Sequence, residues 1–422
     1  MTADLVVLHA RQLMTCAGPA PRRGVAQADA GAIEDGAIAS FQGAIVFAGP
    51  TAELPRRMLA APAVADLQRR HSVVPGFVDA HTHAVFGGDR RDELRRRLAG
   101  ASYAQIAEAG GGIVSTVSAT RAASEAALVE AAVGRLDEML ANGTTTCEIK
   151  SGYGLTTEAE LKLLRVIGDV GSRHSISVVP TFMGAHEVPL EYRDRRAEYV
   201  DLVVDEMIPA VARQNVARWC DVFCEEGVFT PSESARILRA GLAAGLSARI
   251  HADELGSTGG SQVAAAVGAR SADHLIFASS RDISALAAAS VAATLLPIAA
   301  FYLKLGRFAP ARQLIEAGVP VALATDVNPG AGLSPSMPFA IALACFAMGM
   351  TFEEALVAAT LNAAWSLDLA GTSGSLETGK AADFVVVHGD AINVIRVGAA
   401  PVAAVVKGGR LVHGTLPMDT TG

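Results

Sequence analysis

Short apolar runs alternate with longer amphipathic segments through most of the middle of the chain, and this pattern limits the folds open to it. The intervening segments show helical spacing of apolar residues, most clearly over residues 125–142 and 158–170. Eight strand-like runs separated by helices are typical of an α/β fold, a parallel (β/α)8 TIM-type barrel, rather than of an open sheet. The eight runs are residues 73–78, 144–149, 177–180, 221–223, 248–250, 271–274, 292–296 and 321–324.

The two ends of the chain differ from this middle, because both are rich in short runs of β character. Gly408 and Gly409 separate two such runs and predict a hairpin turn. We therefore expect residues 1–70 and 372–422 to form one small discontinuous β-sandwich domain, with the catalytic barrel over residues 71–371. The clearest strand-like runs of the two ends are residues 5–8, 43–49, 383–387 and 402–407.

Composition indicates a globular chain and excludes several classes of partner. Of the 422 residues, 51% are hydrophobic and 18% are charged, which is enough to build a large core. The formal net charge of −8 gives no electrostatic reason to expect nucleic acid or an anionic membrane surface as a partner. No uninterrupted run of about 18 apolar residues predicts a membrane-spanning helix.

The cysteines and the first residues favour a cytoplasmic location. The five cysteines are scattered and odd in number, which fits reduced thiols. Cys220 and Cys224 lie close together, but the segment that joins them alternates like a strand, and no second pair has the spacing of a zinc finger. We therefore expect structural thiols there. Residues 1–10 lack the charged and apolar regions of a signal peptide.

Histidines and an aspartate follow the predicted barrel strands at points where metal ligands are expected. His81 and His83 are two residues apart at the end of the first strand, so both imidazoles face the same side. His251 ends a later strand, and Asp326 ends the last one. Barrel enzymes place their catalytic residues at these carboxyl-terminal ends. Three imidazoles and one carboxylate suit zinc or iron and leave one coordination position open, so we predict one such ion per chain.

Two further side chains are placed to assist hydrolysis at such an ion. A divalent ion lowers the pKa of a bound water toward about 7, and a nearby group must then take up the proton. Glu254 follows His251 by three residues in the same loop, so we predict that it passes this proton to the leaving nitrogen. His274 ends the next strand and is predicted to polarise the attacked group. The alternative for His274 is a hydrogen-bonded histidine of the core.

Motifs at both ends of the chain resemble the amidohydrolase superfamily, in its mononuclear subgroup. The order His-x-His, His-x-x-Glu, His and Asp is shared, and segments 74–83 and 379–386 are similar to its opening and closing motifs. Within this superfamily the chain most resembles the imidazolonepropionase family, and segment 148–155 (EIKSGYGL) is the most specific match. The other matching segments are residues 85–90, 110–113, 184–189, 251–254 and 326–330.

The resemblance implies a reaction, the hydrolytic opening of 4-imidazolone-5-propanoate to N-formimidoyl-L-glutamate in histidine degradation. Metal-bound hydroxide would attack the ring carbonyl, with Glu254 as the proton shuttle. The alternative is a related deaminase or cyclic-amide hydrolase acting on another small heterocycle. Two departures leave that alternative open, because Ala331 replaces an expected Thr or Ser and Ile298 replaces an expected Gly. The superfamily and the high apolar content are compatible with a homodimer.

The resemblance also implies which residues hold a substrate that carries a carboxylate arm. Arg90 offers a guanidinium fork for this carboxylate, although the charged segment 89–97 is equally typical of a solvated surface. Tyr103 and Tyr153 offer phenol groups to the same arm. His186 is implied to bind the ring. The remaining implied substrate contacts are Glu254 and, in the turn after the last strand, Asn328 and Gly330.

Overall fold

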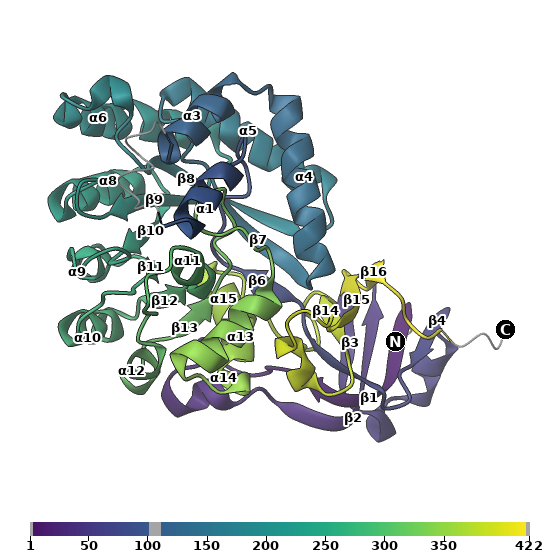
Figure 1. Cartoon of the computed structure of the whole chain (residues 1–422). Coiled ribbons are helices and arrows are strands. Elements are labelled where there is room, and N and C mark those ends of the chain that lie inside the picture. The colour runs from purple at the N-terminus through teal and green to yellow at the C-terminus, as the bar shows by residue number, and fades with distance from the viewer. Residues whose placement is uncertain (1–2, 101–110, 419–422) are drawn as a thin grey trace.

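A curled parallel sheet of eight strands forms the larger part of the molecule (Figure 1). The computed structural model describes residues 3–100 and 111–418. Each barrel strand pairs with the next one along the chain, from β6 to β13, and this confirms the predicted (β/α)8 barrel. The barrel strands are β6 (Phe77–Asp79), β7 (Thr144–Lys150), β8 (Ser177–Ala185), β9 (Trp219–Cys224), β10 (Ser247–Ala252), β11 (Ser271–His274), β12 (Ala292–Leu295) and β13 (Val321–Leu323).

Helices between the strands surround the barrel. Two of them agree closely with the expected ranges 125–142 and 158–170, and both begin at a capping hydroxyl, since Ser124 and Thr156 each accept a backbone N–H of the first turn. The helices are α1 (Arg91–Leu98), α3 (Ile113–Ala122), α4 (Glu125–Ala141), α5 (Thr157–Arg173), α6 (Arg196–Leu202), α7 (Ile208–Gln214), α8 (Pro231–Ala243), α9 (Gly260–Val267), α10 (Ser280–Ala289), α11 (Pro297–Tyr302), α12 (Ala311–Glu316), α13 (Met337–Met348), α14 (Phe352–Ala358) and α15 (Leu361–Ser366). Shorter helical turns are η1 (Gly24–Ala28), η2 (Thr51–Glu53), η3 (Arg56–Ala60), η4 (Leu190–Tyr192), η5 (Val203–Met207) and η6 (Ala391–Ile395).

Both chain ends build a second sheet, which Figure 1 shows in purple and yellow beside the barrel. Its order is β16-β15-β14-β5-β1-β2-β3, with β4 paired to β1, so strands from opposite ends of the chain are neighbours. Along β1, Leu5 and Val7 join one apolar cluster and Val6 joins another, which buries both faces. The strands are β1 (Leu5–Met14), β2 (Ala32–Phe41), β3 (Ala44–Pro50), β4 (Ala63–Asp66), β5 (His71–Pro75), β14 (Phe384–His388), β15 (Val402–Lys407) and β16 (Arg410–Gly414).

The first apolar run, residues 73–78, divides between the two sheets instead of forming one barrel strand. β5 pairs with β14 in the sheet of the chain ends, whereas β6 pairs with β7 in the barrel. Gly76 separates the two strands, and its N–H donates to the Asp383 carbonyl. A Cβ at Gly76 would lie 2.3 Å from Thr145 Oγ1, so a glycine is needed where the chain passes from one sheet to the other.

The barrel closes through residues that follow its first and last strands. The N–H of Asp326 donates to the His81 carbonyl over 3.1 Å. The carboxylate of Asp79 accepts two hydrogen bonds from Thr325, one from its backbone N–H (3.0 Å) and one from its hydroxyl (2.6 Å). These contacts hold together the two strand ends that carry predicted metal ligands.

Two further findings bear on the chain's setting. In the part of the chain that the structure describes, no helix has the length and apolar character needed to span a membrane. All five cysteines are unpaired, and Cys220 and Cys224 are buried in β9.

Substitution of Gly76 tests the passage between the sheets. We expect Gly76→Ala to lower the free energy of unfolding by about 1–3 kcal/mol, because the added methyl collides with Thr145. Gly134→Ala is the matched control, since a methyl there meets no atom within 4 Å and should stabilise α4 by about 0.5–1 kcal/mol. Urea denaturation measures both variants. Equal stability of Gly76→Ala and the wild type would show that Thr145 moves aside without cost.

Candidate active site and metal centre

The carboxyl-terminal ends of the barrel strands surround a cavity of about 500 Å³. His81 is fully buried and is not itself part of the cavity wall. Tyr103 lies outside the described residues. The predicted site residues that line the cavity are His83, Arg90, Tyr153, His186, His251, Glu254, His274, Asp326, Asn328 and Gly330.

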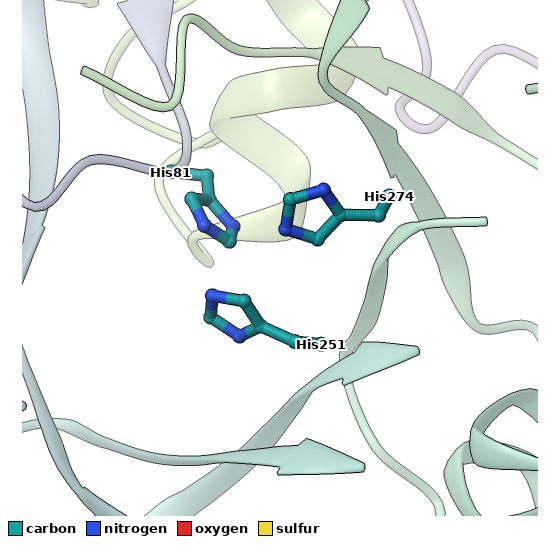
Figure 2. A group of neighbouring side chains, drawn as sticks. All are labelled: His81, His251 and His274. Carbon is teal, nitrogen blue, oxygen red and sulfur yellow. The ribbon is translucent and has the colours of Figure 1, made fainter. Parts of the chain in front are cut away.

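Three imidazole rings converge at the base of this region, as Figure 2 shows for His81, His251 and His274. The ring centroids of His81 and His251 are 4.4 Å apart, and His274 lies 5.2 Å from His251 and 5.4 Å from His81. One nitrogen from each of the three rings lies within 4.8 Å of the others. Side chains from β10, β11 and the segment that follows β6 therefore meet at one point.

Three of the four predicted ligands, His81, His83 and Asp326, each offer one atom within 4.8 Å of the other two. Asp326 Oδ1 lies 3.6 Å from His81 Nε2 and 3.7 Å from His83 Nε2. His83 Nε2 lies 3.3 Å from His251 Nε2. Ligand atoms about 2.0–2.1 Å from a tetrahedral ion stand about 3.3–3.4 Å apart. The distance between His83 and His251 matches this value, and the two distances to Asp326 are slightly longer. His81 Nε2 is also buried with no hydrogen-bond partner among the described residues, and a cation would satisfy it.

Carboxylates behind two of the rings fix their orientation. His81 Nδ1 lies 2.7 Å from Asp273 Oδ2, and His251 Nδ1 lies 3.0 Å from Asp221 Oδ1. With Nδ1 occupied in this way, each ring presents Nε2 to the ligand cluster. Sequence reasoning missed both aspartates. The available signal for Asp221 was a charged residue inside the otherwise apolar strand β9, whereas β11 is a short, mostly polar strand in which Asp273 does not stand out.

Burial sets the protonation of the cluster. It lowers the pKa of His81 and His83 well below the usual value, and for His81 the nearby Lys150 ammonium adds to the effect. Both rings are therefore neutral, as metal ligands must be. Burial, and then the carboxyl of Glu254, raise the pKa of Asp326 well above its ordinary range. A cation bound beside Asp326 would offset this cost.

The backbone is left-handed at several residues of the site. The φ angle is 51° at Asp253, 75° at His274 and 55° at Asp326, although none of these is glycine. Such conformations cost of order 1–3 kcal/mol each and persist where the surrounding contacts enforce them. They occur at the strand ends, where the chain must turn while presenting a side chain to the cavity.

Glu254 stands at the edge of the ligand cluster in a fixed loop. Its backbone N–H and that of Leu255 both donate to Glu225 Oε2, over 3.1 and 2.9 Å. Burial, with a further contribution from Glu225, raises the pKa of Glu254 to about 8. Its Oε1 lies 3.6 Å from His274 Nδ1. A carboxyl group with this pKa can accept and return a proton near neutral pH.

Arg90 belongs to the cavity wall and is not the solvated charge that its neighbours suggested. Its side chain is only 9% exposed, and its Nε donates to Glu93 Oε2 over 2.7 Å. Gly330 makes room for it, because a Cβ there would lie 2.3 Å from Arg90 Nη1. Arg97, which sequence reasoning missed, also lines the cavity and donates to the Gly330 carbonyl over 3.2 Å. Arg90 immediately precedes α1, and Glu93 and Arg97 lie about one turn apart on the same face of that helix.

Aromatic rings form another part of the cavity wall. His186 stacks on His83, with centroids 4.8 Å apart and planes 19° apart. Its Nδ1 lies 3.0 Å from the Gly152 carbonyl, which fixes the ring. Tyr153 lies 5.2 Å from His186, centroid to centroid. This wall offers flat surfaces to a planar heterocycle.

Asn328 shapes its own turn. Its Nδ2 donates to the Asp326 carbonyl (2.7 Å), and its Oδ1 accepts the N–H groups of Gly330 (2.8 Å) and Ala331 (2.7 Å). The amide and the N–H of Gly330 that were expected to meet the substrate are thus occupied within the loop. Of the two departures from the family pattern, Ala331 lines the cavity, but Ile298 is buried in α11 outside its wall.

Comparison with known proteins identifies the family. Residues 72–412 match the amidohydrolase family. The imidazolonepropionase of Symbiobacterium thermophilum is 49% identical over 413 residues, which is 97% of each chain. That of Geobacillus kaustophilus is 48% identical over 417 residues, again 97% of each. The chain belongs to the imidazolonepropionase family of amidohydrolases. With its His and Asp cluster, membership of this family indicates a metal-dependent hydrolase.

Solved structures at lower identity share the fold. The zinc-bound adenosine deaminase of Xanthomonas campestris has a TM-score of 0.70 at 18% identity, covering 100% of this chain and 95% of that one. The guanine deaminase of E. coli has a TM-score of 0.71 at 17% identity, covering 97% and 99%. The same barrel and end sheet therefore recur in enzymes whose sequences have diverged widely.

Removal of one ligand tests the metal centre. We expect His83→Ala to retain about a tenth or less of the wild-type metal after gel filtration, because a site with three remaining ligands binds much more weakly. Elemental analysis by mass spectrometry measures the content. His413→Ala, at an exposed position of β16, is the control and should keep its metal. Full metal content in the His83 variant would remove this residue from the ligand set.

Proposed function

We propose that this chain hydrolyses 4-imidazolone-5-propanoate to N-formimidoyl-L-glutamate, a step of histidine degradation. The observation that supports this most is the convergence in one cavity of a metal-ligand set, a buried carboxyl group and a guanidinium. Relatives that are 49% and 48% identical over nearly the whole chain bear the name of this activity. The cavity of about 500 Å³ accommodates a small heterocycle with a side arm.

The ion that we propose is a single zinc or iron. His81, His83, His251 and Asp326 would hold it, and this mixture of imidazole and carboxylate ligands suits either metal. When bound, such an ion lowers the pKa of a coordinated water toward about 7 and so supplies a nucleophile at neutral pH.

The cavity wall orients the substrate. Arg90 directs its guanidinium to the carboxylate arm, while Glu93 holds the Arg90 Nε from behind. The planar ring lies against His186 and Tyr153. This arrangement brings the ring carbonyl carbon toward the ligand cluster at the far end of the cavity.

Proton transfer falls to Glu254. It accepts a proton from the attacking water as the water oxygen bonds to the ring carbonyl carbon. The neutral ring of His274 donates a hydrogen bond to the developing oxyanion. The ring C–N bond then breaks, and Glu254 returns its proton to the leaving nitrogen. One water is consumed, and the carbonyl carbon becomes the new carboxylate of the product.

The setting that we propose is a cytoplasmic enzyme whose partner is a small heterocycle with a carboxylate arm. The five unpaired cysteines support a reducing compartment. Association into a homodimer stays a prediction that light scattering of the purified protein tests directly.

A direct assay tests the reaction. Loss of the imidazolone chromophore and appearance of N-formimidoyl-L-glutamate should run in parallel in the purified, metal-loaded protein. Aminated purines and pyrimidines are assayed beside it. Faster release of ammonia from any of these, without turnover of the imidazolone, would replace the proposal with a deaminase.

Glu254→Gln separates proton transfer from metal binding. We expect kcat to fall roughly 10²–10⁴-fold, because the amide cannot accept the proton. Metal content should equal that of the wild type, since Glu254 is outside the predicted ligand set. Single-turnover kinetics and elemental analysis measure the two quantities. Unchanged turnover would remove Glu254 from the mechanism.

Arg90→Met tests recognition of the carboxylate arm. We expect KM to rise about 10- to 100-fold, the loss of a charge-assisted hydrogen bond, with kcat within about threefold of the wild type. The propanamide analogue of the substrate is the control, because it carries no charge for Arg90 to bind. A KM for the acid that is the same in both proteins would assign the carboxylate to another group.

A further inference from the structure

Lys150 is a buried cation that the proposed mechanism does not use. It is the last residue of β7, and its side chain is 0% exposed. Its Nζ donates to Glu148 Oε1 over 2.8 Å and to Asp221 Oδ2 over 2.7 Å, and it lies 4.0 Å from Asp273 Oδ2. A buried ammonium group surrounded by three carboxylates must have a different role from a charge on the solvated surface.

Its two close partners, Asp221 and Glu148, contact a predicted metal ligand or the segment that carries one. Asp221 uses its other oxygen, Oδ1, to hold His251 Nδ1. Glu148 uses its other oxygen, Oε2, to accept the N–H of Thr82, the residue between the two histidines of the His-x-His motif (3.1 Å). The Thr82 hydroxyl donates to the Glu148 carbonyl over 2.7 Å. Lys150 therefore joins the ligand segment after β6 to the ligand of β10.

The charge of Lys150 is maintained despite its burial. Burial lowers the pKa of the ammonium, but Asp221 and Glu148 outweigh this and leave the pKa above its usual value. Asp273 has a second cation, because Arg249 Nη2 lies 3.3 Å from its Oδ2. Among the described residues, Lys150 is the cation that forms a salt bridge with Asp221.

We propose that Lys150 is a positioning residue for the metal centre, which acts by holding Asp221 against His251. This inference rests on the proposed metal site and assigns no contact between Lys150 and substrate. Without the ammonium, Asp221 would lose the donor on one oxygen and could rotate away from the imidazole. Outer partners of metal ligands typically contribute 10- to 100-fold to metal affinity.

The experiment compares two variants that differ only at position 150. Glu148→Gln is the control, because it keeps the Lys150–Asp221 contact and an oxygen for the Thr82 N–H. Lys150→Met combined with Glu148→Gln removes one charge of each sign. The net charge of its cluster equals that of the wild type and is one unit more negative than in Glu148→Gln. Each protein is freed of metal and titrated with Zn²⁺ against a chromogenic chelator, and with Co²⁺ while the visible spectrum is recorded.

The expected results are specific to positioning. Glu148→Gln should bind Zn²⁺ within about threefold of the wild type, and the double variant about 10- to 100-fold more weakly, with an altered Co²⁺ spectrum. Equal Zn²⁺ affinity of the double variant and Glu148→Gln would overturn the proposal. If the variant with methionine does not unfold cooperatively, Lys150→Gln combined with Glu148→Gln replaces it, and its Zn²⁺ affinity is compared with that of Glu148→Gln in the same way.

These readouts do not depend on the substrate. Failure of the imidazolone assay together with the expected loss of Zn²⁺ affinity would contradict the proposed function and leave the role of Lys150 intact. Normal turnover of the imidazolone by the wild type, together with equal Zn²⁺ affinities of the double variant and Glu148→Gln, would support the proposed function and contradict the role of Lys150.

Discussion

The need to bury charge inside the barrel governs the rest of this structure. The predicted metal ligands face the interior near the strand ends, and Asp221 and Asp273, the carboxylates that contact them, are not exposed to water. Each buried carboxylate costs several kcal/mol unless cations and hydrogen bonds compensate it. Lys150 and Arg249 provide that compensation, and both are fully buried. Asp221, Asp273, Lys150 and Arg249 thus form a buried ionic layer in contact with the predicted ligands His81 and His251.

Closure of the barrel is a second condition for the site. His81 and Asp326 come from opposite ends of the strand order, so they meet only when the first and last strands are joined. The Asp79 carboxylate makes that junction with Thr325, where no regular strand pairing exists between β6 and β13 in the described structure. Gly76, just before the start of the same strand β6, connects it to the sheet of the chain termini. The short segment 76–81 therefore affects both the stability of the fold and the position of the predicted ligand His81.

Sequence patterns revealed the parts of the site that follow from local periodicity. His251 lies at the end of β10 and Asp326 shortly after β13, as the pattern predicted. β6 ends at Asp79, so His81 and His83 follow the strand, and strand alternation does not explain their placement. The ionic layer escaped detection because it depends on contacts between strands, which no spacing along the chain encodes. Lys150 looked like part of a family motif. Contact between Asn328 and the substrate stays a prediction: its amide makes hydrogen bonds within its own turn, a detail that only three-dimensional geometry shows, and the residue also lines the cavity.

The fold alone does not determine the substrate, because it recurs in enzymes named for different substrates. The two departures from the family pattern carry unequal weight here. Ile298 does not reach the cavity, so it offers no reason to change the substrate, whereas Ala331 removes a hydroxyl from the wall itself. Arg90 lines the same cavity, and the absence of a side chain at Gly330 leaves room for the Arg90 guanidinium. In a protein of net charge −8, such a local cation is the group that we propose attracts an acidic arm.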